Sequence, residues 1–309
     1  MSKQRQRSSL SNGKLGISLP FFIVDSFADG PFQGNPAAVC LVQGVQDIPD
    51  ATKQGIAQEM NLSETCFVST MSIDQKFSEC REFNLRWFTP TNEVSLCGHG
   101  TIAVASIIFN ECENINDKLS FQTLHGEISV RRSGNLMVLD FPQHKPSAMD
   151  VDEEVSKIID EVLRNEFTAV DVQYCQTTKT LLIRLEDFIS RGMLEDLKVN
   201  YYVPSMERLL AAHDGSKVRC VIVTVSGNDG YDFISRVFCP WNGIAEDPVT
   251  GSAHTVLGPY WSERLKGKQE LVACQCSPRG GDLHLSMRGA GRMDISGSAV
   301  TVMKGELDI

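Results

Sequence analysis

The sequence predicts an α+β protein made of two copies of one unit, each with several antiparallel strands and one central helix. The first observation behind this prediction is an internal repeat: residues 82–92, EFNLRWFTPTN, align without a gap with residues 232–242, DFISRVFCPWN, at an offset of 150. Five of the eleven aligned positions are identical and a sixth is acidic in both copies. The second observation is that the same succession of apolar and glycine-rich segments surrounds both stretches.

The chain begins with a basic segment that belongs to neither copy. Residues 1–18 contain four lysines or arginines and no acidic residue. We expect a disordered tail here. A mitochondrial transit peptide is the alternative, because such segments are rich in arginine and serine and poor in acids.

Residues 19–145 form the predicted N-terminal unit. An apolar strand at 65–70 (TCFVST) precedes the repeated stretch, and a glycine turn leading into an apolar helix (CGHGTIAVASIIF, from residue 97) follows it. Next comes HGEISVRRSGNLMVLDF, from residue 125, in which two alternating strands flank a glycine turn. Alternation of apolar and polar residues is typical of strands with one buried face.

Residues 146–297 form the predicted C-terminal unit, which repeats this order. It opens with an acidic amphipathic helix near 151–165 and continues with an apolar strand at 220–225 (CVIVTV). After the repeated stretch come a glycine turn and apolar helix (TGSAHTVLGPYW, from residue 250) and the alternating segment GGDLHLSMRGAGRMDIS, from residue 280. We expect a last strand near 298–309 to return to the N-terminal unit.

The charge and composition of the chain argue against nucleic acid and membranes as its partners. The formal charge of −10 argues against nucleic acid or an anionic membrane surface, and no apolar run is long enough for a membrane span. Ten cysteines form no CxxC pair and lie mostly in apolar strand-like runs, as free thiols do in a reducing compartment. We therefore expect a cytoplasmic protein, and no motif predicts a nucleotide, metal or other cofactor.

The two glycine turns are the candidate site. Each precedes a helix, and the N–H groups of a first helical turn have no intrahelical partners and favour an anion. Glycines at 98, 100 and 251 allow a ligand to approach the backbone closely. Since duplicated units commonly place a site where they meet, we expect the turns to face one cleft that also contains His99 and Asp247.

Cys97 has three possible roles. A proton transfer between two thiols would need a cysteine at both turns, but Thr250 occupies the position equivalent to Cys97, so this mechanism is excluded. A hydrolase with a Cys97–His99 nucleophile is an alternative, although side chains two residues apart across a turn need not meet. Otherwise Cys97 is a packing residue.

Four segments together resemble the phenazine biosynthesis PhzF-like family, and its animal members in particular. They are GNPAAVCLV (34–42), NLSETCFV (61–68), LRWFTPTNEVSLCGHGT (85–101) and AEDPVTGSA (245–253). The resemblance implies the diaminopimelate-epimerase-like fold, in which two pseudo-symmetric domains each wrap a curved, mostly antiparallel sheet around a central helix. It places the active site between the domains and implies a homodimer.

The resemblance also implies an activity. The enzyme that gives the family its name isomerises trans-2,3-dihydro-3-hydroxyanthranilate without a cofactor, so we expect an isomerase acting on a small carboxylate substrate. Glu64 of the SET motif would be the general acid and base, while His99 and Asp247 would orient the substrate and assist proton transfer. The implied substrate-binding residues are Gly98, Gly100, Gly251, Ser252 and Ser63. The alternative is a protein that keeps the fold and acts mainly through binding partners.

Overall fold

The computed structural model describes residues 16–44, 48–164, 166–196 and 204–309. Nearly all of the basic segment at 1–18, for which we expect disorder or a transit peptide, lies outside these residues. Within the described parts of the chain, none of the helices combines the length and apolar character needed to cross a bilayer.

Among the described residues, the first half of the chain forms eight strands and two α-helices. Its elements are β1 (Ser18–Ser26), β2 (Asn35–Val42), α1 (Asp50–Met60), β3 (Glu64–Thr70), β4 (Glu82–Phe88), β5 (Glu93–Val94), α2 (Gly98–Ser106), a π-helical turn (Ile107–Glu111), β6 (Lys118–Thr123), β7 (Gly126–Ser133) and β8 (Leu136–Pro142).

The second half continues with β9 (Ser147–Ala148), α3 (Glu153–Leu163), β10 (Ala169–Cys175), β11 (Thr180–Leu185), α4 (Arg191–Glu195), α5 (Pro204–Ala212), β12 (Cys220–Ser226), β13 (Phe233–Phe238), a 3-10 turn (Pro240–Asn242), α6 (Gly251–Arg264), β14 (Glu270–Gln275), β15 (Gly281–Arg288), β16 (Arg292–Gly297) and β17 (Ala299–Asp308). The helix predicted near 151–165 is α3, which Asp152 caps by accepting a 2.9 Å hydrogen bond from the Val155 N–H.

The two halves pair their strands in the same order. In the first, β1–β2 is antiparallel, β2–β3 parallel, β3–β4 antiparallel, β4–β6 parallel, and β6–β7–β8 antiparallel. In the second, β10 to β16 repeat this succession of parallel and antiparallel pairs. The aligned stretches of the repeat are β4 and β13, so the α+β class and the duplicated topology are confirmed.

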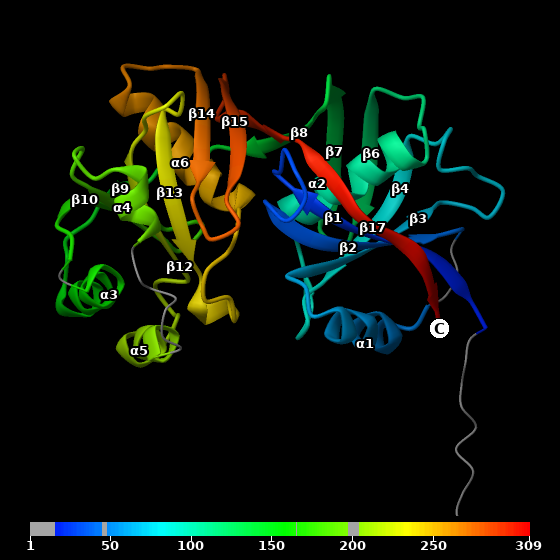
Figure 1. Cartoon of the computed structure of the whole chain (residues 1–309), viewed down its shortest axis with the longest axis horizontal. Helices are drawn as coiled ribbons and strands as arrows, with labels where there is room; N and C mark the ends of the chain where they lie inside the picture. Colours follow the sequence, from blue (N-terminus) through cyan, green and yellow to red (C-terminus); the bar gives the residue numbers. More distant parts are fainter. Residues whose placement is uncertain (1–15, 45–47, 165, 197–203) are drawn as a thin grey trace, which may run out of the picture.

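One helix lies at the centre of each half, α2 in the first and α6 in the second (Figure 1). Both are buried along most of their length, which explains why their sequences are apolar on all sides. Their side chains belong to one hydrophobic core that also takes in the inner faces of the strands. Because α2 and α6 are in contact, the core fixes the position of one helix N-terminus relative to the other.

Strand pairing also joins the halves. β8 pairs antiparallel with β16, and β9 pairs with β10. The last strand, β17, crosses back to lie along β1, with Ser18 opposite Asp308 (Figure 1). The chain therefore closes on its first strand.

Candidate active site

A pocket of about 700 Å³ lies where the two halves meet. This volume suits a small organic ligand. The first turns of α2 and α6 both contribute to its wall, together with residues of the loops around them. Its lining includes seven of the eight residues that the sequence analysis singles out: Ser63, Glu64, Gly98, His99, Asp247, Gly251 and Ser252.

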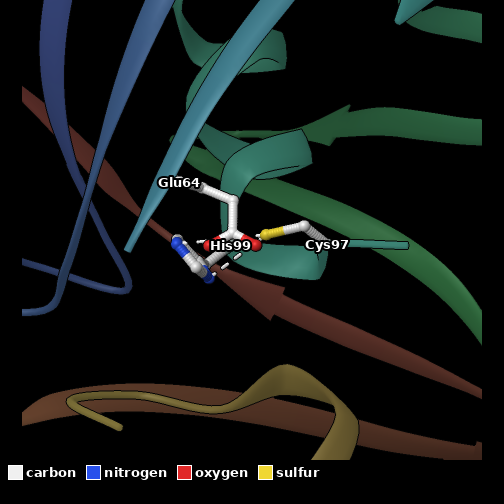
Figure 2. A group of neighbouring side chains, drawn as sticks. All are labelled: Glu64, Cys97 and His99. Atoms are coloured by element: carbon white, nitrogen blue, oxygen red, sulfur yellow. Dashed lines mark hydrogen bonds between the residues drawn. The ribbon is translucent and has the colours of Figure 1, made fainter. Parts of the chain in front are cut away.

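Glu64 is the first residue of β3, and its side chain lies in the wall of the pocket. The residue is 7% exposed, and its carboxyl lies beside the Cys97 thiol and the His99 ring (Figure 2). Burial raises the pKa of Glu64 to about 8, the negative charge of Asp247 adds to this rise, and a hydrogen bond with Cys97 opposes it. A carboxyl with a pKa near neutrality can both release and accept a proton.

Two side chains hold the carboxylate of Asp247, which lies just before α6. Its two carboxylate oxygens accept a 2.7 Å hydrogen bond from Asn35 Nδ2 and a 2.6 Å bond from the Thr250 hydroxyl. Burial raises the pKa of Asp247 to about 6, although these two hydrogen bonds favour the charged form. Asp247 is therefore a fixed, mostly ionised group at neutral pH.

The hydrogen-bond network defines the tautomer of His99. Asn35 Nδ2 donates to Asp247 and to the Val249 carbonyl, so Asn35 Oδ1 faces Ser63 as an acceptor. The Ser63 hydroxyl has only acceptors for its proton, Asn35 Oδ1 at 2.9 Å and the Pro36 carbonyl at 3.0 Å. This arrangement assigns the ring proton to His99 Nε2, which lies 3.2 Å from Ser63 Oγ. Cys97 Sγ lies against the face of the ring, 3.4 Å from Nδ1 and 3.9 Å from Nε2.

Cys97 and His99 are in contact, which the sequence spacing alone does not require. Cys97 is the N-cap of α2, and its sulfur accepts a 3.3 Å hydrogen bond from the Gly100 N–H. Burial and the neighbouring Glu64 carboxyl raise the pKa of the Cys97 thiol well above its usual value. His99 is no better placed as a base, because burial lowers its pKa to about 4. These environments disfavour the thiolate that a hydrolase at Cys97 would need.

The two helix ends differ in their caps. In α2, the Cys97 side chain caps the N–H group of Gly100. The N–H groups of Gly98 and His99, one and two residues earlier in the same first turn, have no intrahelical partners. In α6, Thr250 makes no side-chain cap because its hydroxyl bonds to Asp247. The first N–H groups of α6, from Gly251 and Ser252, therefore also face the pocket without a cap.

Gly100 lies behind the pocket wall instead of on it. A Cβ at this position would stand 2.8 Å from Cys66 Sγ, 3.1 Å from Cys97 Sγ and 3.1 Å from Trp87 Cδ1. Its N–H is already bonded to the Cys97 sulfur. The structure thus gives Gly100 a packing role, in contrast to the substrate contact expected for it, because only glycine lets α2 approach the core this closely.

Sequence reasoning missed two polar residues that hold the site, Asn35 and Gln275. Asn35 is hydrogen-bonded to both Ser63 and Asp247, although it lies 212 residues before Asp247 in the sequence. Gln275 donates to the Asp247 carbonyl at 2.6 Å and accepts from the Thr250 N–H at 2.8 Å. The Asn-Pro pair at residues 35–36 looked like an ordinary turn, and Gln275 lies in an alternating strand, so neither carried a distinctive signal.

A first prediction concerns the coupling between the two carboxyls. Asp247→Asn is expected to lower the pKa of Glu64, because it removes the negative charge that disfavours ionisation of Glu64. The measurement is a pH titration of the Glu64 side-chain carboxyl by ¹³C NMR in both proteins. A pKa that stays unchanged or rises in the variant would contradict electrostatic coupling. Asp232→Asn, at a residue that does not line the pocket, serves as the matched control.

Comparison with known proteins places these features in context. Residues 24–305 match the family model described as "Phenazine biosynthesis-like protein". Mouse phenazine biosynthesis-like domain-containing protein 2 is 47% identical over 296 residues, covering 94% of this chain and 99% of the mouse protein. A Pseudomonas aeruginosa protein described as an uncharacterized isomerase is 40% identical over 294 residues, covering 95% and 100% of the two chains.

Solved structures agree with this. The crystal structure of a PhzF-family phenazine biosynthesis protein from Enterococcus faecalis aligns with a TM-score of 0.80 and 35% identity, covering 95% of this chain and 100% of that one. A hydroxyproline epimerase from Agrobacterium vitis aligns with a TM-score of 0.58 at 12% identity over 96% and 94% of the two chains, which shows a shared fold.

The duplicated strand order, the two central helices and the pocket between the halves define a two-domain protein of the diaminopimelate-epimerase-like fold. Within that class, the chain belongs to the phenazine biosynthesis-like (PhzF) family.

Proposed function

We propose that this chain is a cofactor-independent isomerase that moves a proton between two carbon atoms of a small carboxylate substrate, with Glu64 as the general acid and base. The observation that carries the proposal is the position of Glu64. The Glu64 carboxyl, with a pKa of about 8, lies at the wall of the pocket between the domains, which the N-termini of α2 and α6 also line.

The helix ends provide the site for the substrate carboxylate. The N–H groups of Gly98 and His99 on α2, and of Gly251 and Ser252 on α6, would donate to its oxygens. Helix dipoles favour negative charge at these positions, and the charge that develops when a carbon loses its proton would be stabilised in the same way. Arg219, also at the pocket, adds a positive charge at its edge.

One carboxyl, that of Glu64, is sufficient to carry the proton between the two carbon atoms. Ionised Glu64 takes a proton from one carbon, the electron pair moves through the conjugated substrate, and protonated Glu64 returns the proton to the second carbon. Atoms and charge balance without an oxidant or a second thiol. Asp247 stays ionised, is held by Asn35 and Thr250, and keeps the pKa of Glu64 raised.

The Pseudomonas aeruginosa relative supports this class of reaction, since its description as an uncharacterized isomerase belongs to a protein that shares 40% of its residues with this chain. It says nothing of the substrate. We therefore leave the substrate at the level of a small, conjugated or α-acidic carboxylate.

Hydrogen exchange with solvent tests the proposal directly. The full chain is incubated in D₂O with a panel of small cyclic and amino carboxylates, dihydro-hydroxyanthranilate included, and loss of C–H signals is followed by ¹H NMR. Deuterium uptake or a shifted double bond that survives in Cys97→Ala supports a carboxylate mechanism. Loss of exchange in Cys97→Ala would instead favour thiol chemistry, and silence across the panel would favour a protein that acts through binding partners.

A further inference from the structure

Three side chains of different chemistry converge on one wall of the pocket. Glu64, Cys97 and His99 each offer one ligand atom, and these atoms all lie within 4.8 Å of one another (Figure 2). A carboxylate oxygen, a sulfur and an imidazole nitrogen are the donor types that bind Zn²⁺ in proteins. The sequence shows no zinc-type spacing, because Glu64 lies 33 residues before Cys97 and only the fold joins them.

We propose that Glu64, Cys97 and His99 form a binding site for Zn²⁺, and that the bound ion inhibits the enzyme by occupying its catalytic carboxyl. The first part rests on the three ligands alone. The second part rests on the function proposed for Glu64.

The distances suit a tetrahedral ion. Ligands at about 2.0–2.3 Å from zinc lie roughly 3.3–3.8 Å from one another at tetrahedral angles. Cys97 Sγ and His99 Nδ1 are already 3.4 Å apart. The Glu64 carboxylate oxygen lies within 4.8 Å of the other two donors. Since β3 and the first turn of α2 fix the backbones, the adjustments needed are a shift of this carboxylate and a rotation of the His99 ring.

The ring of His99 turns when it binds the ion. Cys97 Sγ is 3.4 Å from Nδ1 and 3.9 Å from Nε2, so the sulfur of the metal-free protein lies against the face of the ring. Rotation about the Cβ–Cγ bond of His99 directs a ring nitrogen toward the ion. Metal-binding histidines generally fix their other nitrogen by a hydrogen bond, and Ser63 Oγ, now 3.2 Å from Nε2, is a partner for it.

The fourth position of the ion would be open. The three ligands are themselves nearly buried but line the pocket of about 700 Å³, so water or a substrate carboxylate can complete the coordination. Asp247 is not needed as a ligand, because Asn35 and Thr250 occupy both of its oxygens. Its negative charge nearby nevertheless favours a bound cation. On binding, the protons of the Cys97 thiol and the Glu64 carboxyl leave to solvent, and the thiolate and carboxylate become zinc ligands.

The site is tested on the full chain without substrate. Zn²⁺ binding is measured by isothermal titration calorimetry, and Co²⁺ serves as a spectroscopic substitute, because a thiolate ligand gives a charge-transfer band in the near ultraviolet. We expect one equivalent of Zn²⁺, a cobalt–thiolate band, and at least about 100-fold weaker binding in Cys97→Ala, as loss of a ligand requires. His99→Gln provides a second ligand variant in case Cys97→Ala folds poorly.

Cys274→Ala is the matched control, since Cys274 is also a buried free cysteine but lies on β14 away from the three ligands. It is expected to retain the zinc affinity and the band. If Cys97→Ala and Cys274→Ala bind Zn²⁺ equally well, or if wild type shows no thiolate band, the site is overturned.

Inhibition is tested with the exchange assay. Zn²⁺ is expected to stop exchange in wild type, a chelator to restore it, and Cys97→Ala to lose zinc sensitivity whatever its own rate. Exchange that continues with zinc bound would overturn the inhibitory role. The two proposals fail separately: zinc binding without any exchange activity contradicts only the isomerase, and Glu64-dependent exchange without zinc binding contradicts only the metal site.

Discussion

Glu64→Gln is expected to lower the rate of proton exchange on the active substrate by about 10³-fold, within the usual range for the loss of a general acid or base. Glutamine has nearly the same shape but can neither take a proton from carbon nor deliver one. The binding surface formed by the two helix ends stays in place, so KM is expected to change far less than kcat. The measurement is steady-state exchange of wild type and variant followed by ¹H NMR.

The pH dependence of folding stability shows whether Glu64→Gln is inactive because it unfolds or because it has lost the catalytic carboxyl. Folding raises the pKa of Glu64 from 4.5 to about 8, so the folded state disfavours the ionised form. This destabilising contribution is absent below pH 4.5, grows as the pH rises, and is complete above about pH 8. Glu64→Gln is therefore expected to be as stable as wild type at pH 4.5 and more stable at pH 9. A variant that is inactive and also less stable at pH 9 would contradict the assignment.

Much of the fold could be predicted because the chain repeats itself. The agreement of Phe83, Arg86 and Phe88 with Phe233, Arg236 and Phe238 marks β4 and β13 as equivalent, and the order of strands around them follows. The two glycine turns could also be located, because glycine before an all-apolar helix is a local signal.

The interior of the site could not be predicted in the same way. Asn35 and Asp247 are 212 residues apart, and nothing local distinguishes an asparagine that bonds to a carboxylate from one that forms a turn. Glu64 by itself looks like a loop glutamate before a strand, and only the family resemblance singled it out. The contact of Cys97 with His99 depends on the cap geometry of α2, which spacing alone does not determine.

The repeat also contains a pair of equivalent ion pairs that differ in burial. Arg236 on β13 binds Glu246 through two hydrogen bonds, Nε–Oε1 at 2.6 Å and Nη2–Oε2 at 2.8 Å, and both side chains are 3% exposed. Its counterpart Arg86 on β4 binds Glu93 in the same manner, at 2.7 and 2.6 Å, but these side chains are 23% and 24% exposed. Arg86 also pairs with Asp50.

Glu246→Gln is therefore expected to lower the free energy of unfolding by about 3–5 kcal/mol, because it removes the carboxylate that binds the nearly buried Arg236 guanidinium through two hydrogen bonds. Glu93→Gln is expected to cost at most about 1 kcal/mol, since water and Asp50 still compensate Arg86. Urea unfolding of both variants at pH 7 measures the difference. Equal losses would mean that burial does not govern these pairs. A larger loss at Glu246 would show that burial makes its ion pair with Arg236 the more stabilising of the two.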